Sequence, residues 1–147
     1  RIREMPEMPE TPLELLPGEP LLLPSGGVLE AEWVVPEAAE RARVLEGRVD
    51  PLTEAWLDRG EAAARLWVRR WLPGDRYRPL GAPGRRKLKR CFADAGIPRG
   101  ERGARPIVLD REGGILWIPG LPPAEAGRLG ARTNRALRLT YHPSKPR

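Results

Sequence analysis

Residues 69–106 read RRWLPGDRYRPLGAPGRRKLKRCFADAGIPRGERGARP and carry the densest structural signals in this 147-residue chain. Residues 74–84 hold three glycines and two prolines, which predicts a loop. Residues 85–95 place Leu, Cys, Phe and Ala at helical spacing on one face and cations over the rest, the pattern of an amphipathic helix. Gly96 is a natural C-cap for this helix, and Pro98 prevents its continuation.

Alternating apolar and polar residues predict strands on both sides of this stretch. The expected strands cover residues 28–35, 65–71, 106–110, 115–118 and 135–141. The strands over residues 106–110 and 115–118 form a predicted hairpin around residues 111–114. Further short apolar runs, separated by Pro-Gly turns, cover residues 13–16 and 21–23. Residues 36–46 predict a short helix that Gly47 ends, and residues 51–60 a turn or a single helical turn.

These elements predict an α+β fold class, with mostly antiparallel short strands and two or three short helices. We expect one domain over residues 11–142, because a chain of this length suits a single core. Residues 1–10 alternate proline with charge and are interpreted as a linker, and residues 143–147 as a tail.

The net charge of +6 is divided unevenly between two parts of the expected domain. Residues 1–66 carry 7 arginines and 14 acidic residues, whereas residues 67–147 carry 19 basic and 6 acidic residues. We therefore distinguish an acidic first half, residues 11–64, from a basic second half, residues 65–142. A basic region of this kind favours a polyanionic partner such as nucleic acid, although charged, arginine-rich surfaces also occur without one.

The composition excludes several other classes of protein. A single cysteine, Cys91, cannot form an internal disulfide, and with His142 it provides too few soft ligands for a zinc site. No apolar run approaches the ~20 residues that span a bilayer, so the expected location is the cytoplasm. Scarce amides and proline-rich loops suit a thermophile.

The sequence also lacks a recognisable catalytic set. Ser25-Gly26-Gly27 resembles the start of a pyrophosphatase-type phosphate loop, but the Asp and Ser that complete such a loop are absent, which favours a hairpin turn. There is no Walker-type loop, and the one histidine lies near the end of the chain. We expect no catalysis, no metal and no cofactor in this chain by itself.

The motif in residues 69–106 is similar to the C-terminal domain of tRNA(Ile)-lysidine synthase. The family pattern runs Arg-x-aromatic-x-Pro-Gly-Asp-Arg-aromatic-x-Pro-Leu-Gly, followed by a basic pair with Leu, then Phe, Asp, Ile-Pro, Arg, Pro and a Trp-x-x-Gly turn. The matching positions here are Arg69, Trp71, Pro73, Gly74, Asp75, Arg76, Tyr77, Pro79, Leu80, Gly81, Arg86, Lys87, Leu88, Phe92, Asp94, Ile97, Pro98, Arg102, Pro106, Trp117 and Gly120. The chain departs from the pattern at Arg90, where an acid is common, and after Gly120, where a basic residue is common.

The resemblance implies a specific function and fold. The family's full enzyme is an ATP- and magnesium-dependent ligase that joins lysine to the wobble cytidine of isoleucine tRNA with a CAU anticodon. Its catalytic domain precedes the region that this chain resembles. The C-terminal domain helps to hold the tRNA, chiefly at the acceptor stem, and has a sandwich-like α+β fold also found in the beta subunit of phenylalanyl-tRNA synthetase.

Two groups of site residues follow from the chemistry of their side chains. The candidates for contact with tRNA phosphates are Arg76, Arg78, Arg85, Arg86, Lys87, Lys89, Arg90, Arg99 and Arg102. Each can instead be a structural ion pair or part of a solvated helix face. The residues expected to shape the loops are Pro73, Gly74, Asp75, Pro79, Gly81, Ile97, Pro98, Trp117 and Gly120.

Two alternatives to tRNA binding remain open at this point. The basic half can dock on an acidic protein surface, either on a partner or on the enzyme's own N-terminal catalytic domain. A free-standing enzyme of another type is the third hypothesis, which the missing catalytic residues disfavour. A steep fall in RNA affinity with salt separates the first hypothesis from the second.

Overall fold

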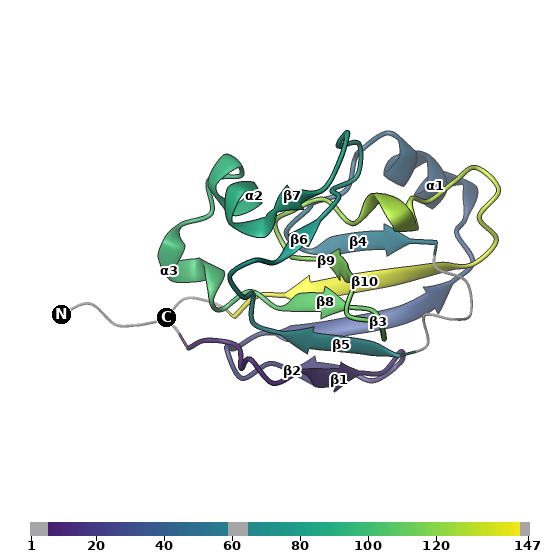
Figure 1. The fold of residues 1–147 in the computed structure, drawn as a ribbon. Helices are drawn as coiled ribbons and strands as arrows, with labels where there is room; N and C mark the ends of the chain where they lie inside the picture. Colours follow the sequence, from purple (N-terminus) through teal and green to yellow (C-terminus); the bar gives the residue numbers. More distant parts are fainter. Residues whose placement is uncertain (1–5, 59–64, 145–147) are drawn as a thin grey trace.

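The computed structural model describes residues 6–58 and 65–144, and its ordered core is a sandwich of two four-stranded antiparallel sheets (Figure 1). The first sheet has the order β1 (Leu13–Leu15), β5 (Leu66–Arg69), β8 (Ile107–Leu109) and β9 (Ile115–Trp117). The second has the order β2 (Leu21–Leu22), β3 (Val28–Val34), β10 (Ala136–His142) and β4 (Glu54–Leu57). The predicted α+β class with short antiparallel strands is confirmed.

Apolar side chains from facing strands form the central core. The main cluster joins Leu66 and Val68 of the first sheet to Leu29, Leu137 and Leu139 of the second. These residues alternate along their strands with more exposed ones, so the predicted period of two places them on the inner face. β3 and β10 pair along their whole length, from Val34↔Ala136 to Val28↔His142.

The first sheet is covered on its other face as well. All three residues of β8 and of β9 are buried, because Val108, Leu116 and Trp117 belong to the central core and the other three side chains to a second one. Ile107, Leu109 and Ile115 belong to a second cluster, formed with α2 (Leu88–Asp94) and Tyr77. A small two-stranded sheet, β6 (Arg76–Tyr77) and β7 (Arg86–Lys87), lies beside α2, and α3 (Arg99–Arg102) follows (Figure 1).

Two further helical elements complete the fold. α1 (Ala38–Leu45) agrees with the predicted helix, and Glu37 and Glu40 form a capping box at its start. A short 3-10 helix, Glu125–Gly127, precedes β10. A third apolar cluster, centred on Trp56, Leu129 and Ala136, packs beneath this region.

Two sequence expectations were wrong for physical reasons. Residues 51–60 were expected to form a turn, yet β4 lies within them and pairs with β10, where Ala55, Trp56 and Leu57 are all buried. The linker expected over residues 1–10 does not hold for residues 7–9. The side chain of Met8 is only 2% exposed, and the carbonyl of Pro9 accepts a 2.8 Å hydrogen bond from the Arg70 amide.

Candidate nucleic-acid interface

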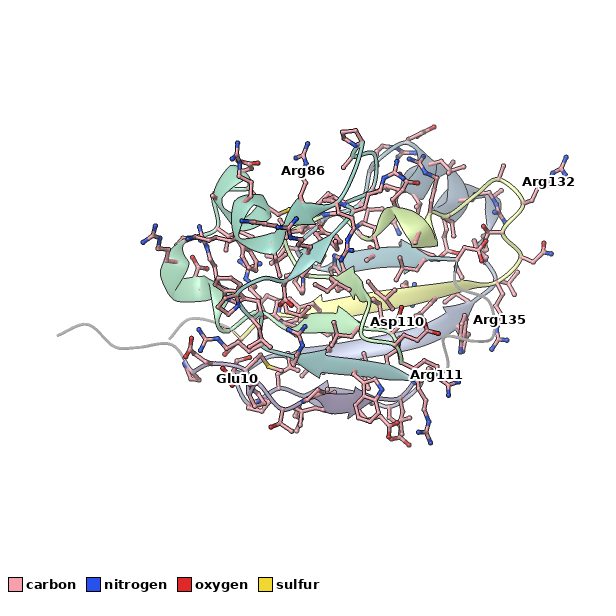
Figure 2. All side chains as sticks on the ribbon, in the orientation of Figure 1. Glu10, Arg86, Asp110, Arg111, Arg132 and Arg135 are labelled. Carbon is pink, nitrogen blue, oxygen red and sulfur yellow. The ribbon has the colours of Figure 1, made fainter. Side chains whose placement is uncertain are left out.

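The outer layer formed by β6, β7 and α2 presents cations to solvent and apolar side chains to the first sheet. Tyr77, Leu88, Cys91 and Phe92 are buried in the second cluster. The opposite side of the layer carries seven exposed basic residues, which we call the basic patch: Arg76, Arg78, Arg85, Arg86, Lys87, Lys89 and Arg90. Figure 2 shows Arg86 projecting away from the sheets on this layer. Burial of the apolar face therefore orients the cations outward.

The helix of this layer is shorter than the sequence predicts. It was expected over residues 85–95, but it begins at Leu88 and ends at Asp94. Arg86 and Lys87 instead lie in β7, where they pair with Tyr77 and Arg76 of β6. The amide of Leu88 donates a 2.8 Å hydrogen bond to the carbonyl of Asp75, which joins the start of the helix to the preceding loop. The basic patch thus spans a hairpin and a helix rather than one helical face.

Asp75 fixes the loop that leads into the hairpin. Its carboxylate oxygens accept hydrogen bonds of 2.9 and 3.0 Å from the two terminal nitrogens of Arg69, and a 2.7 Å bond from the amide of Leu72. The side chains of Arg69 and Asp75 are 13% and 12% exposed. Gly74 beside them has a φ of +93°, a left-handed conformation that favours glycine. This arrangement sets the direction in which β6 leaves the first sheet.

Tyr77 anchors the hairpin from below. Its hydroxyl donates a 2.9 Å hydrogen bond to the carbonyl of Pro122, and its side chain is buried. Burial raises the pKa of Tyr77 well above its ordinary value, so the phenol stays neutral at physiological pH. A neutral, hydrogen-bonded tyrosine is a structural anchor, and the neighbouring Arg76 and Arg78 are left on the exposed side.

Most cations of the basic patch have no acidic partner among residues 6–58 and 65–144. No described carboxylate lies within ion-pair distance of Arg76, Arg85, Arg86, Lys87 or Lys89. The two remaining members have weak or local contacts. Arg78 donates a 2.7 Å hydrogen bond through Nε to the carbonyl of Ala82, and Arg90 Nε lies 3.8 Å from Asp94 Oδ1.

Arginines outside the patch are more often neutralised. Arg43 pairs with Glu54 at 2.7 Å, Arg138 pairs with Glu32, and Arg70 pairs with Glu7 at 2.9 Å. The acidic residues of the first half therefore balance cations within the sandwich. Within residues 6–58 and 65–144, five cations without an acidic partner lie together on the outer layer, whereas Arg99, Arg111 and Arg132 are single exposed cations elsewhere.

The arginines in and just after α3 make different contacts. Arg99 is exposed and has no acidic partner in the described part of the chain. Arg102 instead donates from Nε to the carbonyl of Ile97 at 2.9 Å and stacks over the Phe92 ring at 5.6 Å. Arg105 is held by the carbonyl of Pro119 at 2.8 Å. The threefold spacing of these arginines in the sequence therefore does not produce one continuous cationic surface.

Two concavities lie within the basic patch. Arg86, Lys87, Arg90 and Asp94 line an open depression of about 560 Å³. A second cleft, of about 420 Å³, lies between β6, the 113–115 segment and the 124–126 segment. Its charged lining residues are Asp75, Arg76, Arg78 and Arg85. Gly113 and Gly114 form part of the rim of this cleft, and no local sequence pattern indicates that role.

The remaining loop residues of the predicted motif hold this layer in place. Pro79 forms an isolated bridge with Ala124, and the amide of Gly81 donates a 2.9 Å bond to Glu125. Pro73 precedes Gly74 in the turn after β5, and Ile97 is buried beside Pro98 at the start of α3. Gly120 has a φ of +100° and its amide donates to the carbonyl of Pro51.

The tryptophans lie in or against the core clusters rather than in the basic patch. Trp117 is fully buried, and its Nε1 donates a 3.0 Å bond to the carbonyl of Leu121. Trp71 meets the Phe92 ring edge-on at a centroid distance of 5.5 Å, and Trp67 packs against the same cluster. Half-buried Trp33 carries the guanidinium of Arg135 over its ring at 4.3 Å.

Glu125 supplies a pH-dependent contact below this layer. Its bonds to Arg128 and to the amide of Gly81 lower the pKa of Glu125 to about 2. A depressed carboxyl pKa contributes stability that is complete above the unfolded value of about 4.3 and is lost as the pH falls towards 2. We expect Glu125→Gln to remove that part of the pH dependence. Thermal unfolding at pH 2, 3, 4 and 7 checks this, and identical profiles for variant and parent contradict it.

A cavity outside the basic patch lies on the other side of the 3-10 helix region. An apolar pocket of about 430 Å³ lies between α1, β4 and Pro122–Pro123, which no local sequence pattern predicts. Across residues 6–58 and 65–144, no three or more His, Cys, Asp or Glu side chains are arranged to hold a metal ion. No helix in those ranges is long and apolar enough to cross a bilayer.

The sequence of this chain is similar to those of known proteins that share its motif. The family model described as the TilS substrate C-terminal domain matches residues 66–139. A tRNA(Ile)-lysidine synthase from Symbiobacterium thermophilum is 36% identical over 125 residues, which cover 85% of this chain and 24% of that protein. A bifunctional protein TilS/HprT from Listeria monocytogenes is 39% identical over 85 residues, covering 58% of this chain and 13% of that protein. The chain thus spans about a quarter or less of these relatives.

Solved structures agree with this assignment. A crystal structure of a TilS C-terminal domain superposes with a TM-score of 0.73 at 29% identity, covering 92% of this chain and all of that one. An N-terminal fragment of the phenylalanyl-tRNA synthetase beta subunit from Pyrococcus horikoshii superposes with a TM-score of 0.58 at 16% identity, covering 80% and 39%. The second likeness concerns the fold alone.

The two antiparallel sheets and the short helices define a class of small α+β sandwich domains, a fold shared with both of these structures. Within that class, the chain belongs to the C-terminal domain family of tRNA(Ile)-lysidine synthase. The resemblance inferred from residues 69–106 is confirmed.

Proposed function

We propose that this chain binds tRNA on its basic patch and supplies part of the substrate affinity of a tRNA(Ile)-lysidine synthase. The observation that carries the proposal is the group of five exposed cations without acidic partners on one layer, namely Arg76, Arg85, Arg86, Lys87 and Lys89. Positive side chains on neighbouring elements repel each other. An RNA backbone relieves that repulsion, and its bound counterions are released.

The acceptor stem of isoleucine tRNA is the proposed contact. An A-form stem hides its major groove, so a protein reads it through phosphates, 2′-hydroxyls and the shape of the minor groove. Arginines and lysines distributed over a hairpin and a short helix suit such a surface, because they meet phosphates without entering a groove. Ligation of lysine to the wobble cytidine, together with the ATP and magnesium it requires, is assigned to the part of the enzyme outside this chain.

A salt-dependent binding titration tests the proposal. Labelled isoleucine tRNA with a CAU anticodon is titrated with the chain between 0.05 and 0.3 M salt, with methionine tRNA as competitor. If about five phosphates are contacted, the logarithm of the binding constant falls with a slope of roughly −4 against the logarithm of salt concentration. An acceptor-stem minihelix is expected to retain most of the affinity, and an anticodon hairpin little of it.

Two outcomes would count against the proposal. Equal, negligible binding of all RNAs at low salt would remove tRNA binding and favour docking of the basic patch on another protein surface. Strong binding of the anticodon hairpin with none of the minihelix would retain RNA binding and overturn the acceptor-stem assignment.

A further inference from the structure

The cleft beside β6 differs from the rest of the basic patch because three arginines line one concavity. Arg76, Arg78 and Arg85 line a space of about 420 Å³, whereas the other depression is lined by two arginines, a lysine and Asp94. Asp75 is the carboxylate in the lining of the cleft, and both of its oxygens already accept hydrogen bonds from Arg69. The three arginines thus line one space, and the one acid in its lining is already paired with Arg69.

The arginines are held in different ways that suit one oxyanion. Arg78 is oriented by the 2.7 Å bond from its Nε to the carbonyl of Ala82, and that bond leaves its two terminal nitrogens free to donate. Arg76 extends from β6, and Arg85 enters from the loop before β7. Gly113 and Gly114 form part of the rim and place no side chain over the opening.

The hairpin beside the cleft carries an electrostatic cost in the free protein. Arg76 lies directly opposite Lys87 in the β6–β7 register, and like charges in that position destabilise a strand pair. No described carboxylate pairs with either residue. An acidic residue at one of these two positions would stabilise the strand pair better than a second cation does. A bound anion between the two cations removes their repulsion.

We propose that Arg76, Arg78 and Arg85 form a phosphate-binding subsite within the basic patch. The planar fork of each guanidinium donates in pairs to phosphate oxygens, and the three positive charges exceed both the single charge of a phosphodiester and the roughly two charges of a terminal phosphate. The phosphate comes from RNA, so its source rests on the proposed function. It is either a backbone phosphodiester or the 5′-terminal phosphate of the tRNA.

Inorganic phosphate tests the subsite without any RNA. We compare the thermal midpoint of the 147-residue chain in sodium phosphate and in sodium chloride at equal pH and ionic strength. The double variant Arg76→Thr/Arg85→Ala is expected to lose most of the phosphate-specific rise in midpoint. Arg48→Ala/Arg132→Ala also removes two exposed arginines, and Arg132 lies at the far end of the molecule in Figure 2. This double variant is the matched control and should keep the rise. General salting effects of phosphate act equally on all variants.

The single variant Arg76→Thr shows whether a lost phosphate response comes from loss of the subsite or from misfolding. Threonine suits a strand, and its introduction removes the like-charge pair, so the midpoint in chloride should rise slightly or stay level. A folded, slightly more stable protein that no longer responds to phosphate supports the subsite. A double variant that keeps the full phosphate response overturns it.

Binding of tRNA then distinguishes the two sources. The double variant should bind roughly thirtyfold more weakly at 0.15 M salt, since each lost phosphate contact weakens binding about fivefold. If removal of the 5′-phosphate from the tRNA abolishes this difference, the terminal phosphate is the ligand; if the difference persists, a backbone phosphate is. A phosphate response without any tRNA binding would sink the proposed function and leave the subsite. Undiminished tRNA binding by the variant would sink the subsite and leave the function.

Discussion

The triple variant Arg86→Ala/Lys87→Ala/Lys89→Ala should bind tRNA about a hundredfold more weakly than the parent chain at 0.15 M salt. These three residues are exposed, lie on β7 and α2, and have no acidic partner among the described residues. Each phosphate contact contributes about fivefold at this salt concentration, and its loss lowers the steepness of the salt dependence by about 0.9. The slope of the salt plot is therefore expected to fall by about three.

A second triple variant controls for the loss of charge alone. Arg48, Arg65 and Arg132 are exposed and lie on other parts of the surface, so their replacement by alanine removes the same charge. We expect this control to weaken binding only a few-fold, through the long-range field. Equal losses in the two triple variants would mean that net charge, rather than the basic patch, determines binding. A loss confined to the control would place the RNA surface elsewhere.

Asp75→Ala should lower the free energy of unfolding by about 3 kcal/mol. The change removes the acceptor for both terminal nitrogens of Arg69 and for the amide of Leu72, in a pair that is little exposed. Arg69 keeps one 2.8 Å bond to the carbonyl of Arg70, which limits the loss. Urea unfolding followed by tryptophan fluorescence measures the effect, and Asp75→Asn should cost less because its oxygen still accepts from Leu72.

Asp94→Ala is the matched control for this effect. Asp94 lies 3.8 Å from Arg90 in an exposed pair at the end of α2, and such pairs contribute within about 0.5 kcal/mol. The comparison separates a carboxylate that shapes a loop from one that only lies near a cation. If Asp75→Ala lowers the free energy of unfolding no more than Asp94→Ala does, the loop does not depend on the Arg69–Asp75 ion pair.

Much of the fold follows from local patterns that act over a few residues. The alternation in β3, β5 and β10 was read correctly, because each strand has one face in a core and one nearer to solvent. The hairpin of β8 and β9 followed from its glycine-rich turn, and α1 from Pro36 and Gly47. The family motif followed from the order of residues 69–106 and agrees with the match over residues 66–139.

Elements whose structure depends on distant partners were not predictable in this way. β4 has no alternating pattern, since three successive side chains are buried, and it is a strand because β10 offers an edge to pair with. Met8 is a core residue because its own amide donates to the carbonyl of Gly103 and the carbonyl of Pro9 accepts from the amide of Arg70. Its surrounding sequence of proline and glutamate is that of a linker.

The basic surface illustrates the same division. The sequence by itself determined which residues are cationic, that Leu88, Cys91 and Phe92 share a buried face, and that glycine and proline shape the loop around Gly74 and Asp75. Only the tertiary structure decided that the helix begins at Leu88, because the pairing of β6 with β7 and the bond from Leu88 to Asp75 compete with an earlier start. It also decided which cations are free, because ion pairing depends on contacts between residues far apart in the chain, as between Arg138 and Glu32.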